Sequence, residues 1–568
     1  MSTLARWCYQ HRLVVVLLWL GALIGLAAVS QGAGSAYSNS FSLPNTESTR
    51  ALNLLKSSFP AESGDTDTVV WHVEAGSVRD SVTKARMTGT LDKIAELPEV
   101  SGITSPYSPQ GAAQISKDGR TAYAQVNFAK VQQELDKSDI QRVIDTAEGA
   151  RTDGLQVELG GQAIKSTEQT PPATSELVGV LAAAVVLFVA FGSLFAMLLP
   201  ILTAVAGVGT AILTTGLLSH AMTIGEIAPT LSALIGLGVG IDYALFIVTR
   251  HRKGLQSGLE VQESLVRAVN TSGRAVLFAG GTVCIALLGM FVLQTKFLNG
   301  IAVASALTVA LTVLASVTLL PALLGLLGAR VLGRRARRRL AAGQPLPENA
   351  ASGPWARWAA VVERRPRALS LVALVVMVTL TIPVFSLRLG SSDSGNDPAS
   401  STTRKAYDLL ADGFGPGFNG PLQLVAQAPS AADKAALTGL SARLQSVEGV
   451  ASVAAPPIRP GSTVGIIQVF PTTSPQDKQT SDLIDNLRDK VIPSAEKGTT
   501  LKVYVGGTTA IFNDFATVLT GKLPLFIGVI VVLAGLLLML AFRSLLIPLI
   551  GAVTVSYTHL TLPTIYSV

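Results

Sequence analysis

The chain alternates between long apolar runs and two long polar stretches. Crossing a bilayer as a helix takes roughly 20 apolar residues. Runs of that kind occur at about 13–30, 174–192, 195–219, 227–249, 275–294, 300–328, 368–388 and 523–542. A ninth run begins near Leu545 and stays apolar to Val555. The pattern predicts a polytopic α-helical membrane protein.

The two polar stretches show the same alternation of strand and helix periods. The first predicts strand 67–75, helix 78–97, strands 99–104 and 119–128, helix 132–151 and strand 155–161. The second predicts strand 421–428, helix 430–446, strands 450–455 and 463–470, helix 475–493 and strand 501–507. This β-α-β-β-α-β order is that of ferredoxin-like α+β domains. Such a fold hosts many functions, so it predicts architecture and no substrate.

The two halves of the chain repeat each other. Each opens with one span, continues into a polar domain and returns to the membrane. Ala-Phe-Gly-Ser-Leu at 190–194 recurs as Ala-Phe-Arg-Ser-Leu at 541–545, and Leu-Gly-Gly at 159–161 recurs as Val-Gly-Gly at 505–507. We therefore expect an internal two-fold repeat, which is common in transporters, with the pathway between the repeats.

Basic residues indicate the orientation, because cytoplasmic loops carry an excess of Lys and Arg. They gather in 1–12, 250–274 and 330–367. An even number of spans separates these segments, so they fall on one side and both polar domains fall on the other. The net charge of +7 is explained by this topology, and no nucleic-acid partner is expected. Membrane lipids are expected partners, and the arginines of 334–339 can touch anionic headgroups.

These signals divide the chain into eight parts. They are a first transmembrane helix (1–30), an extracytoplasmic domain (31–173), a five-helix bundle (174–328), a basic cytoplasmic linker (329–367), a seventh helix (368–388), a second extracytoplasmic domain (389–522), an eighth and a partial ninth helix (523–555), and a tail (556–568).

The tail breaks the apolar pattern, since it brings His559 and Pro563 where a ninth span would continue. From Ser556 it resembles read-through of a sequencing adaptor, with a divergent natural terminus as the alternative. We expect a truncated chain that is inactive as a fragment.

Signals for other chemistry are weak. Cys8 and Cys284 are the only cysteines, and both lie in or beside predicted spans, so neither polar domain can hold an internal disulfide. The five histidines have no metal-ligand spacing, and no nucleotide-binding lysine loop is present. The sequence therefore predicts no metal, no ATP-driven mechanism and no enzyme activity.

Asp242 is the candidate for functional chemistry. It lies near the middle of the otherwise uncharged stretch 230–248. A carboxylate in hydrocarbon costs a few kcal/mol or more, and such groups usually carry protons or bind ions. The structural alternative is a polar group that a neighbouring helix satisfies. Tyr243 can donate to a carboxylate or extend a chain of water molecules, with simple packing as its alternative; the two side chains point about 100° apart.

The residues around Asp242 are expected to support it. Gly236 and Gly240 have the small-xxx-small spacing that lets helix backbones approach each other. We expect Gly236, Gly238, Gly240 and Phe246 to pack near the proton relay, and Arg250 and Arg252 to anchor the helix at the cytoplasmic surface.

Here the sequence resembles a known family. Gly-Ile-Asp-Tyr-Ala-Leu-Phe-Ile-Val-Thr-Arg-His-Arg at 240–252 is similar to the pattern Gly-x-Asp-Tyr-x-x-Phe-x-x-x-Arg-x-Arg of the MMPL family, in the resistance–nodulation–division superfamily of proton-driven exporters. The segments 43–55, 401–410 and 414–422 agree, and the resemblance runs from residue 1 to about 555.

The resemblance implies two porter-type polar domains and export of hydrophobic or lipidic small molecules, driven by the proton motive force. It places the chain in the bacterial cytoplasmic (inner) membrane, with no cofactor, protons as the coupling ion and a homo-oligomer as a possible assembly. Asp242 and Tyr243 would be one half of the relay. The family has twelve spans and a second Asp-Tyr-like pair in the tenth, a position that falls beyond Val568 here.

Two other function classes stay open. One is a sterol-sensing-like membrane scaffold, and the other is an accessory subunit of protein translocation. A scaffold does not need Asp242, so the intramembrane carboxylate favours the exporter.

Overall fold

The computed structural model describes residues 1–37, 46–58, 65–130, 135–168, 172–334, 354–383, 393–459 and 461–545, with residues 43, 337, 338 and 390 between these ranges. The chain divides into two compact units. Unit 1 comprises Met1–Phe41, Pro172–Arg388 and Leu519–Val568, and unit 2 comprises Ser42–Pro171 and Leu389–Val518. The predicted ninth span beyond Leu545 and the tail, at 546–568, lie outside the described residues, as do residues 335–336 and 339–353 of the linker.

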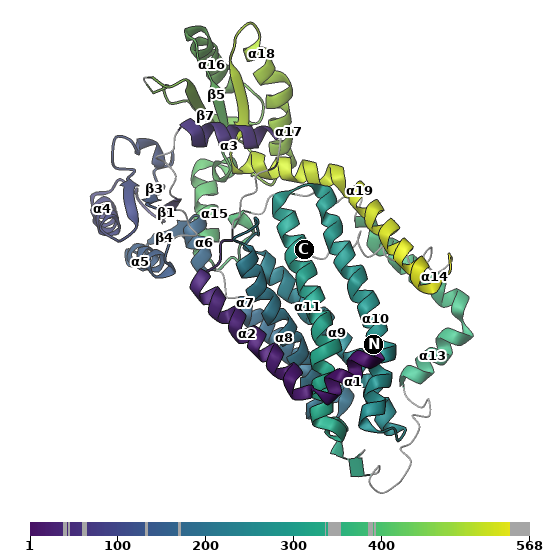
Figure 1. Cartoon of the computed structure of the whole chain (residues 1–568). Coiled ribbons are helices and arrows are strands. Elements are labelled where there is room, and N and C mark those ends of the chain that lie inside the picture. The colour runs from purple at the N-terminus through teal and green to yellow at the C-terminus, as the bar shows by residue number, and fades with distance from the viewer. Residues whose placement is uncertain are drawn as a thin grey trace. The chain divides into compact units, whose positions relative to one another are not determined.

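Unit 1 consists of helices (Figure 1). They are α1 (Ser2–Gln10), α2 (Arg12–Ala33), α7 (Pro172–Phe191), α8 (Leu194–Leu218), α9 (Ala228–Gln256), α10 (Val261–Leu288), α11 (Lys296–Leu327), α13 (Pro354–Arg364), α14 (Pro366–Thr381) and the end of α19 (Thr508–Phe542). Six helices are long and apolar enough to span a membrane among the described residues, and α7 and α14 are shorter apolar helices. A helix is present at each of the eight predicted spans, and the chain is a multi-pass membrane protein.

Two boundaries differ from the expectation. The predicted first helix is divided at His11, because Ala5 and Cys8 are buried on one face of α1 and the helix packs on α10 and α11. At the other end, α19 begins directly after a strand, at Thr508, and continues without a break through the predicted span at 523–542.

The core of unit 1 is the packing of α8, α9, α10 and α11 against one another (Figure 1). About half to two thirds of the apolar windows of α8, α9 and α11 is buried. By contrast, only 6% is buried in α2 and in α19, and α14 has no buried residue. An apolar helix whose surface is not covered by protein is expected where the helix contacts lipid.

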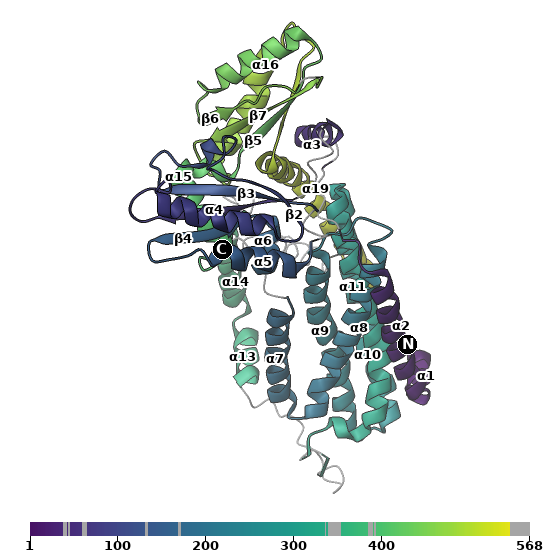
Figure 2. The same cartoon turned by 90° about the vertical axis from the view of Figure 1, so that its left-hand side faces the viewer.

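Unit 2 contains two four-stranded antiparallel sheets (Figure 2). The first has the order β2-β3-β1-β4, from β1 (Thr66–Val73), β2 (Val100–Thr104), β3 (Thr121–Phe128) and β4 (Leu155–Gly160). Its connections include α4 (Ser81–Ala95) and α5 (Lys137–Glu148), and α6 (Gln162–Glu168) follows β4.

The second sheet has the equivalent order β6-β7-β5-β8. Its strands are β5 (Leu422–Gln427), β6 (Val450–Ala454), β7 (Val464–Pro471) and β8 (Lys502–Gly506). Its helices are α16 (Ala431–Leu444) and α17 (Lys478–Asn486), which continues through a π-helical turn, Leu487–Val491, into α18 (Ile492–Glu496). The strand and helix order expected from the sequence is therefore present in both sheets.

Each sheet is covered on its second face by a helix from the other half of the chain. On the first sheet, Val69, Trp71 and Val73 face the core with α4 and α5, whereas Val70 packs against Ala406 of α15 (Thr402–Phe414). On the second sheet, Val425 packs against Ala51 of α3 (Glu47–Ser58). Alternate residues of a strand point to opposite faces, so this exchange of α3 and α15 buries both faces of both sheets.

Candidate functional site

The candidate carboxylate lies on α9, which packs on three neighbouring helices. A β-carbon added to Gly236 would lie 2.4 Å from Thr308 Cγ2 on α11 and 2.8 Å from Val208 Cγ2 on α8. One added to Gly240 would lie 2.9 Å from Ala204 Cβ. All three distances are shorter than van der Waals contact, so only glycine permits this approach of the helices.

Gly238 and Phe246, the other two residues expected near the relay, are not in such close contact with another helix. A β-carbon on Gly238 would have no atom within 4 Å among the described residues, and Phe246 is 60% exposed. In the described part of the chain these two residues lie on the open face of α9, and their expected role near the relay stays a prediction. The reason is geometric, since Gly238 is rotated by about 200° from Gly236 along the helix.

Asp242 lies on this open face. Leu234, Gly238, Asp242 and Phe246 are all exposed and follow each other at intervals of four, so they form one stripe. Among the described residues, no hydrogen bond or ion pair reaches Asp242. The stripe therefore presents one carboxylate within an apolar surface in the middle of a predicted span.

Tyr243 lies on a different face from Asp242, as their rotation predicts. Its ring is 8% exposed and packs in the core of the bundle with Val313 and Val276. A β-carbon on Gly280 of α10 would be 3.4 Å from its Cε2. The structure thus places Tyr243 between helices and does not join its hydroxyl to Asp242 by a hydrogen bond.

A row of hydroxyl side chains on α11 faces the inner side of α9, and the sequence pattern did not identify it as part of the site. Ser305, Thr308, Thr312 and Ser316 of α11 are fully buried. Thr308 and Thr312 donate to the carbonyl oxygens four residues earlier, at 2.8 and 2.9 Å. Ser232 of α9 lies 3.2 Å from Ser305, oxygen to oxygen. Their regular spacing on one predicted span was the available signal.

Two arginines at one end of the bundle donate hydrogen bonds to the ends of neighbouring helices. Arg252 donates from Nη2 to Phe191 O at 2.7 Å, and its guanidinium lies 4.7 Å from the Phe191 ring centre. Arg12 donates from Nη1 to Gly325 O at 2.7 Å. Both acceptors are near the carboxyl ends of helices, where a cation is favoured by the helix dipole. Arg250 is exposed.

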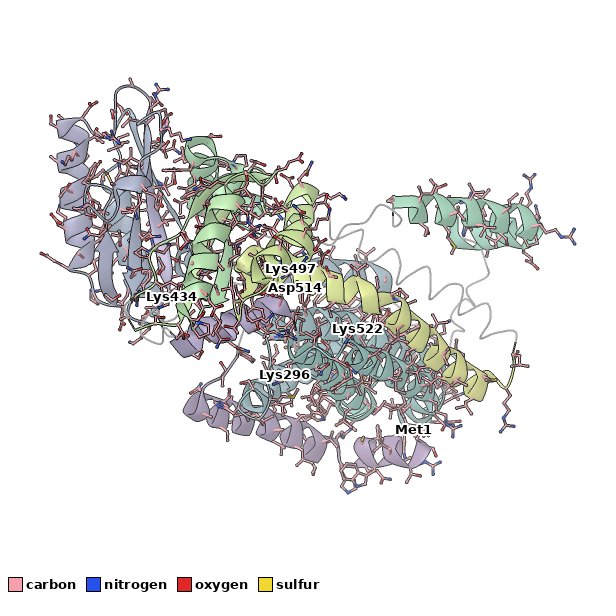
Figure 3. The ribbon with its side chains drawn as sticks, turned by 90° about the horizontal axis from the view of Figure 1, so that it is seen from above. Met1, Lys296, Lys434, Lys497, Asp514 and Lys522 are labelled. Carbon is pink, nitrogen blue, oxygen red and sulfur yellow. The ribbon has the colours of Figure 1, made fainter. Side chains whose placement is uncertain are left out.

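The opposite end of the bundle holds few charges. Ala36 donates its amide to Ser219 Oγ at 2.8 Å, and Lys522, labelled in Figure 3, donates to Leu293 O at 3.0 Å. Arg12 and Arg252 thus lie at one end of the bundle and Lys522 at the other, and the orientation expected from the sequence stays a prediction. Among the described residues, no group of three or more His, Cys, Asp or Glu side chains is placed to hold a metal ion.

Comparison with known proteins decides the family. The model of the MMPL family matches residues 40–369 and 426–563. The chain belongs to the MMPL family. This confirms the resemblance drawn from the motif at 240–252, and the MMPL relatives that carry a functional name are named as transport proteins.

Three MMPL relatives illustrate the range of similarity. "Membrane protein YdfJ" of Bacillus subtilis is 34% identical over 97% of this chain and 74% of its own length. "Mycolic acid-containing lipids exporter MmpL11" of Mycolicibacterium smegmatis is 31% identical over 65% of this chain and 39% of its own length. "Heme uptake protein MmpL11" of Mycobacterium tuberculosis is 30% identical over 63% and 37%. The chain spans well under half of either MmpL11 protein that it matches.

Proposed function

We propose that this MMPL protein exports hydrophobic or lipidic small molecules across the bacterial cytoplasmic membrane in exchange for protons. Asp242 would carry the proton, and Tyr243 would lie beside the path. Protons are the coupling ion, and the proposal needs no cofactor and no enzymatic step. The relative named as an exporter of mycolic acid-containing lipids supports the substrate class.

The observation that carries the proposal is the position of Asp242. It is exposed on an otherwise apolar stripe of a membrane helix. An ionised carboxylate there costs several kcal/mol, and a protonated one costs much less. A group of this kind changes its charge readily when a water-filled path or a cation reaches it, which is the property that a proton carrier needs.

The charge asymmetry of unit 1 supports the proposed orientation. The end with Arg12 and Arg252 would face the cytoplasm. Unit 2, with its two sheets, would then be extracytoplasmic and would form the porter-type domains of an internal two-fold repeat.

Two alternatives stand beside this proposal. One alternative is uptake in place of export, because one relative is named as a heme uptake protein. A membrane scaffold would be favoured if Asp242 were only a structural group.

The test is transport in proteoliposomes with an imposed pH gradient. The protein from the complete reading frame of its gene is reconstituted beside the 568-residue chain. The probe is phosphatidylethanolamine with a fluorescent headgroup, whose movement between leaflets is read by its accessibility to dithionite. Pyranine inside the vesicles reports proton movement at the same time.

Asp242→Asn keeps the shape of the side chain but cannot exchange a proton. We expect lipid movement and coupled proton movement to fall to the level of empty vesicles. Glu260→Gln, which changes an exposed carboxylate between α9 and α10, is the matched control and should keep full activity. Full activity of Asp242→Asn would remove Asp242 from the mechanism, and lipid movement without proton movement would exclude proton coupling.

A further inference from the structure

An apolar groove opens in unit 1 between α2, α8 and α11. Its volume is about 320 Å³. The residues that line it are Trp7, Val15, Leu18, Trp19, Ala22, Thr210, Leu311, Leu314 and Thr318. None of these residues belongs to α9, the helix that carries Asp242.

The Trp19 indole and the hydroxyls of Thr210 and Thr318, which lie in the wall, are already used within the protein. The Trp19 indole donates to Thr318 Oγ1 at 3.1 Å, and Thr318 donates to Leu314 O at 2.6 Å. The Thr210 hydroxyl donates to Ala206 O at 2.8 Å. A hydroxyl bonded to its own helix offers little to a polar ligand. The groove therefore suits a hydrocarbon chain.

On α2 the groove is lined from Val15 to Ala22, which is a rise of about 10 Å. Arg12 lies about one turn before Val15, so the rise from Arg12 to Ala22 is about 15 Å. The hydrocarbon core of a bilayer is about 30 Å thick. A chain that enters beside Arg12 and follows α2 would thus reach the middle of the bilayer at Ala22.

The mouth of the groove is positively charged. Arg12 lies one turn before Val15, and Arg6 is exposed next to Trp7. The Arg12 guanidinium uses one donor on Gly325 O and lies 5.8 Å from the Tyr9 ring centre. An arginine has five N–H donors, so Arg12 keeps donors for an anion. Trp7 is 44% exposed, as expected of a tryptophan at the membrane surface.

We propose that this groove binds one acyl chain of an anionic phospholipid from the leaflet at the basic end of the bundle. The phosphate group lies against Arg6 and Arg12, and the chain lies between α2 and α11. The site is separate from the proposed proton path and does not depend on the direction or existence of transport. Each arginine near the surface should favour an anionic headgroup by about fivefold.

Tryptophan fluorescence tests the site, because Trp7 and Trp19 form its wall. In the whole chain, Trp71, Trp355 and Trp358 are replaced by phenylalanine. The protein is reconstituted in phosphatidylcholine vesicles with rising fractions of dibrominated phosphatidylglycerol or of dibrominated phosphatidylcholine. We expect brominated phosphatidylglycerol to quench with an apparent affinity at least fivefold higher. Equal quenching by the two lipids would show bulk lipid only and would overturn the proposal.

Two pairs of variants separate the headgroup from the chain. Arg6→Gln with Arg12→Gln should bring the affinity ratio to about one, whereas Arg12→Lys should keep most of the preference. Ala22→Phe fills the groove and should reduce quenching by both lipids. Leu20→Phe, on the same helix at an exposed position outside the groove, should leave it unchanged.

Circular dichroism and gel filtration establish that each variant is folded. An unchanged headgroup preference in the folded double arginine variant would overturn the phosphate contact. Unchanged quenching in folded Ala22→Phe would overturn the acyl-chain site. Absence of quenching by either brominated lipid would mean that protein covers the groove, and would also overturn it.

Discussion

The two sheets of unit 2 have one topology and one helix exchange, but different side chains fix the exchanged helices. The amide of Leu159 on β4 donates to the Thr402 hydroxyl of α15 at 2.8 Å. The equivalent amide of Val505 on β8 donates to the Glu47 carboxylate of α3 at 2.7 Å. β4 and β8 are edge strands, and exposed edges are prone to pair with other chains. In both sheets the exchanged helix therefore covers an edge, once with a neutral group and once with a charged one.

The contacts of α15 are mainly between hydroxyls, amides and carboxylates. Thr402 donates to Glu158 Oε2 at 2.7 Å. Glu168, at the end of α6, accepts from the Thr402 amide at 2.7 Å and from the Thr403 hydroxyl at 2.5 Å. The anionic Glu168 thus lies at the amino end of α15, where the helix dipole favours it.

The contacts of α3 are centred on one cation. Arg488 donates from Nη1 and Nη2 to the two oxygens of Asp514, labelled in Figure 3, at 2.5 and 3.1 Å. Its Nε lies 3.3 Å from Glu47 Oε2. Asp514 in turn accepts from the Ser48 amide at 3.2 Å and the Ser48 hydroxyl at 2.5 Å. Two carboxylates in a partly buried place depend on a single guanidinium.

The comparison shows that one arrangement of helix and sheet can differ in how much stability it loses when a single contact residue is replaced. A buried ion pair gains little net stability over an apolar contact, but removal of one partner leaves an uncompensated charge. A neutral hydrogen bond loses less when it is cut. The second sheet should therefore be the more fragile of the two toward single substitutions at the exchanged helix.

The largest expected effect follows from Arg488→Met. It leaves Glu47 and Asp514 buried together without a cation, and we expect unit 2 to lose about 3–5 kcal/mol of unfolding free energy. Pulse proteolysis of the whole chain in detergent across a urea series measures this. Arg142→Met is the matched control, because Arg142 lies 346 residues earlier at the equivalent place of the first sheet.

Arg142 pairs with Asp139 on the surface, where its side chain is 53% exposed. Its replacement should cost less than about 1 kcal/mol. Similar losses in both variants would contradict the view that the cation fixes only α3.

A second difference between the sheets is a buried carboxylate. Asp67 is 2% exposed, and it accepts from the Ile164 amide at the start of α6 at 2.8 Å. The residue in register with it on the second sheet is Leu422, as the pairings of β1 with β4 and of β5 with β8 show. Burial, with a smaller contribution from Asp65, raises the pKa of Asp67 to about 7.

This raised pKa predicts a pH dependence of stability. Between about pH 4 and pH 7 the folded chain holds a proton on Asp67 that the unfolded chain has released, so stability falls as the pH rises through that window. The fall should be on the order of 2–4 kcal/mol. Asp67→Asn should remove it and keep an acceptor for Ile164, whereas Asp92→Asn, at an exposed position of α4, should retain it. An unchanged profile in Asp67→Asn would assign the effect to another group.

Most of the secondary structure of both sheets could be predicted from the sequence. The strands of both sheets, such as those at 155–160 and 502–506, and the helices that connect the strands follow the local periodicity of apolar residues. The exchange of α3 and α15 could not, because its contacts join residues such as Ser48 and Asp514 that are 466 positions apart. A local sequence pattern predicts that a short helix is amphipathic, but it does not indicate which sheet that helix will cover.

The candidate site was predictable to a similar depth. A single carboxylate in an apolar span marks Asp242 without any structure. Its open face could not be foreseen, since which side of α9 packs depends on Ala204 and Thr308 of other helices. The row of buried hydroxyls on α11 was visible as a spacing of four from Thr308 to Thr312 and Ser316, but threonine and serine are common in membrane helices, so the spacing alone did not indicate a role.

The smallest expected effect concerns the neutral hydroxyl of Thr402, which attaches α15 to the edge of the first sheet. Thr402→Val keeps the shape of the side chain and removes the hydroxyl that accepts from Leu159 and donates to Glu158. Arg151, at 2.8 Å from Glu158, still compensates that carboxylate, so the main cost is one buried amide without a partner. We expect a loss of about 1–2 kcal/mol, together with faster hydrogen exchange at the Leu159 amide. The matched change on the second sheet is Glu47→Gln, which keeps an acceptor for Val505 but weakens the contact with Arg488. Because Asp514 alone can still neutralise Arg488, its loss should also stay well below that of Arg488→Met. If Thr402→Val instead destabilised unit 2 as much as Arg488→Met, the two connections would be equally sensitive, and the contrast between a neutral and a charged attachment would be wrong.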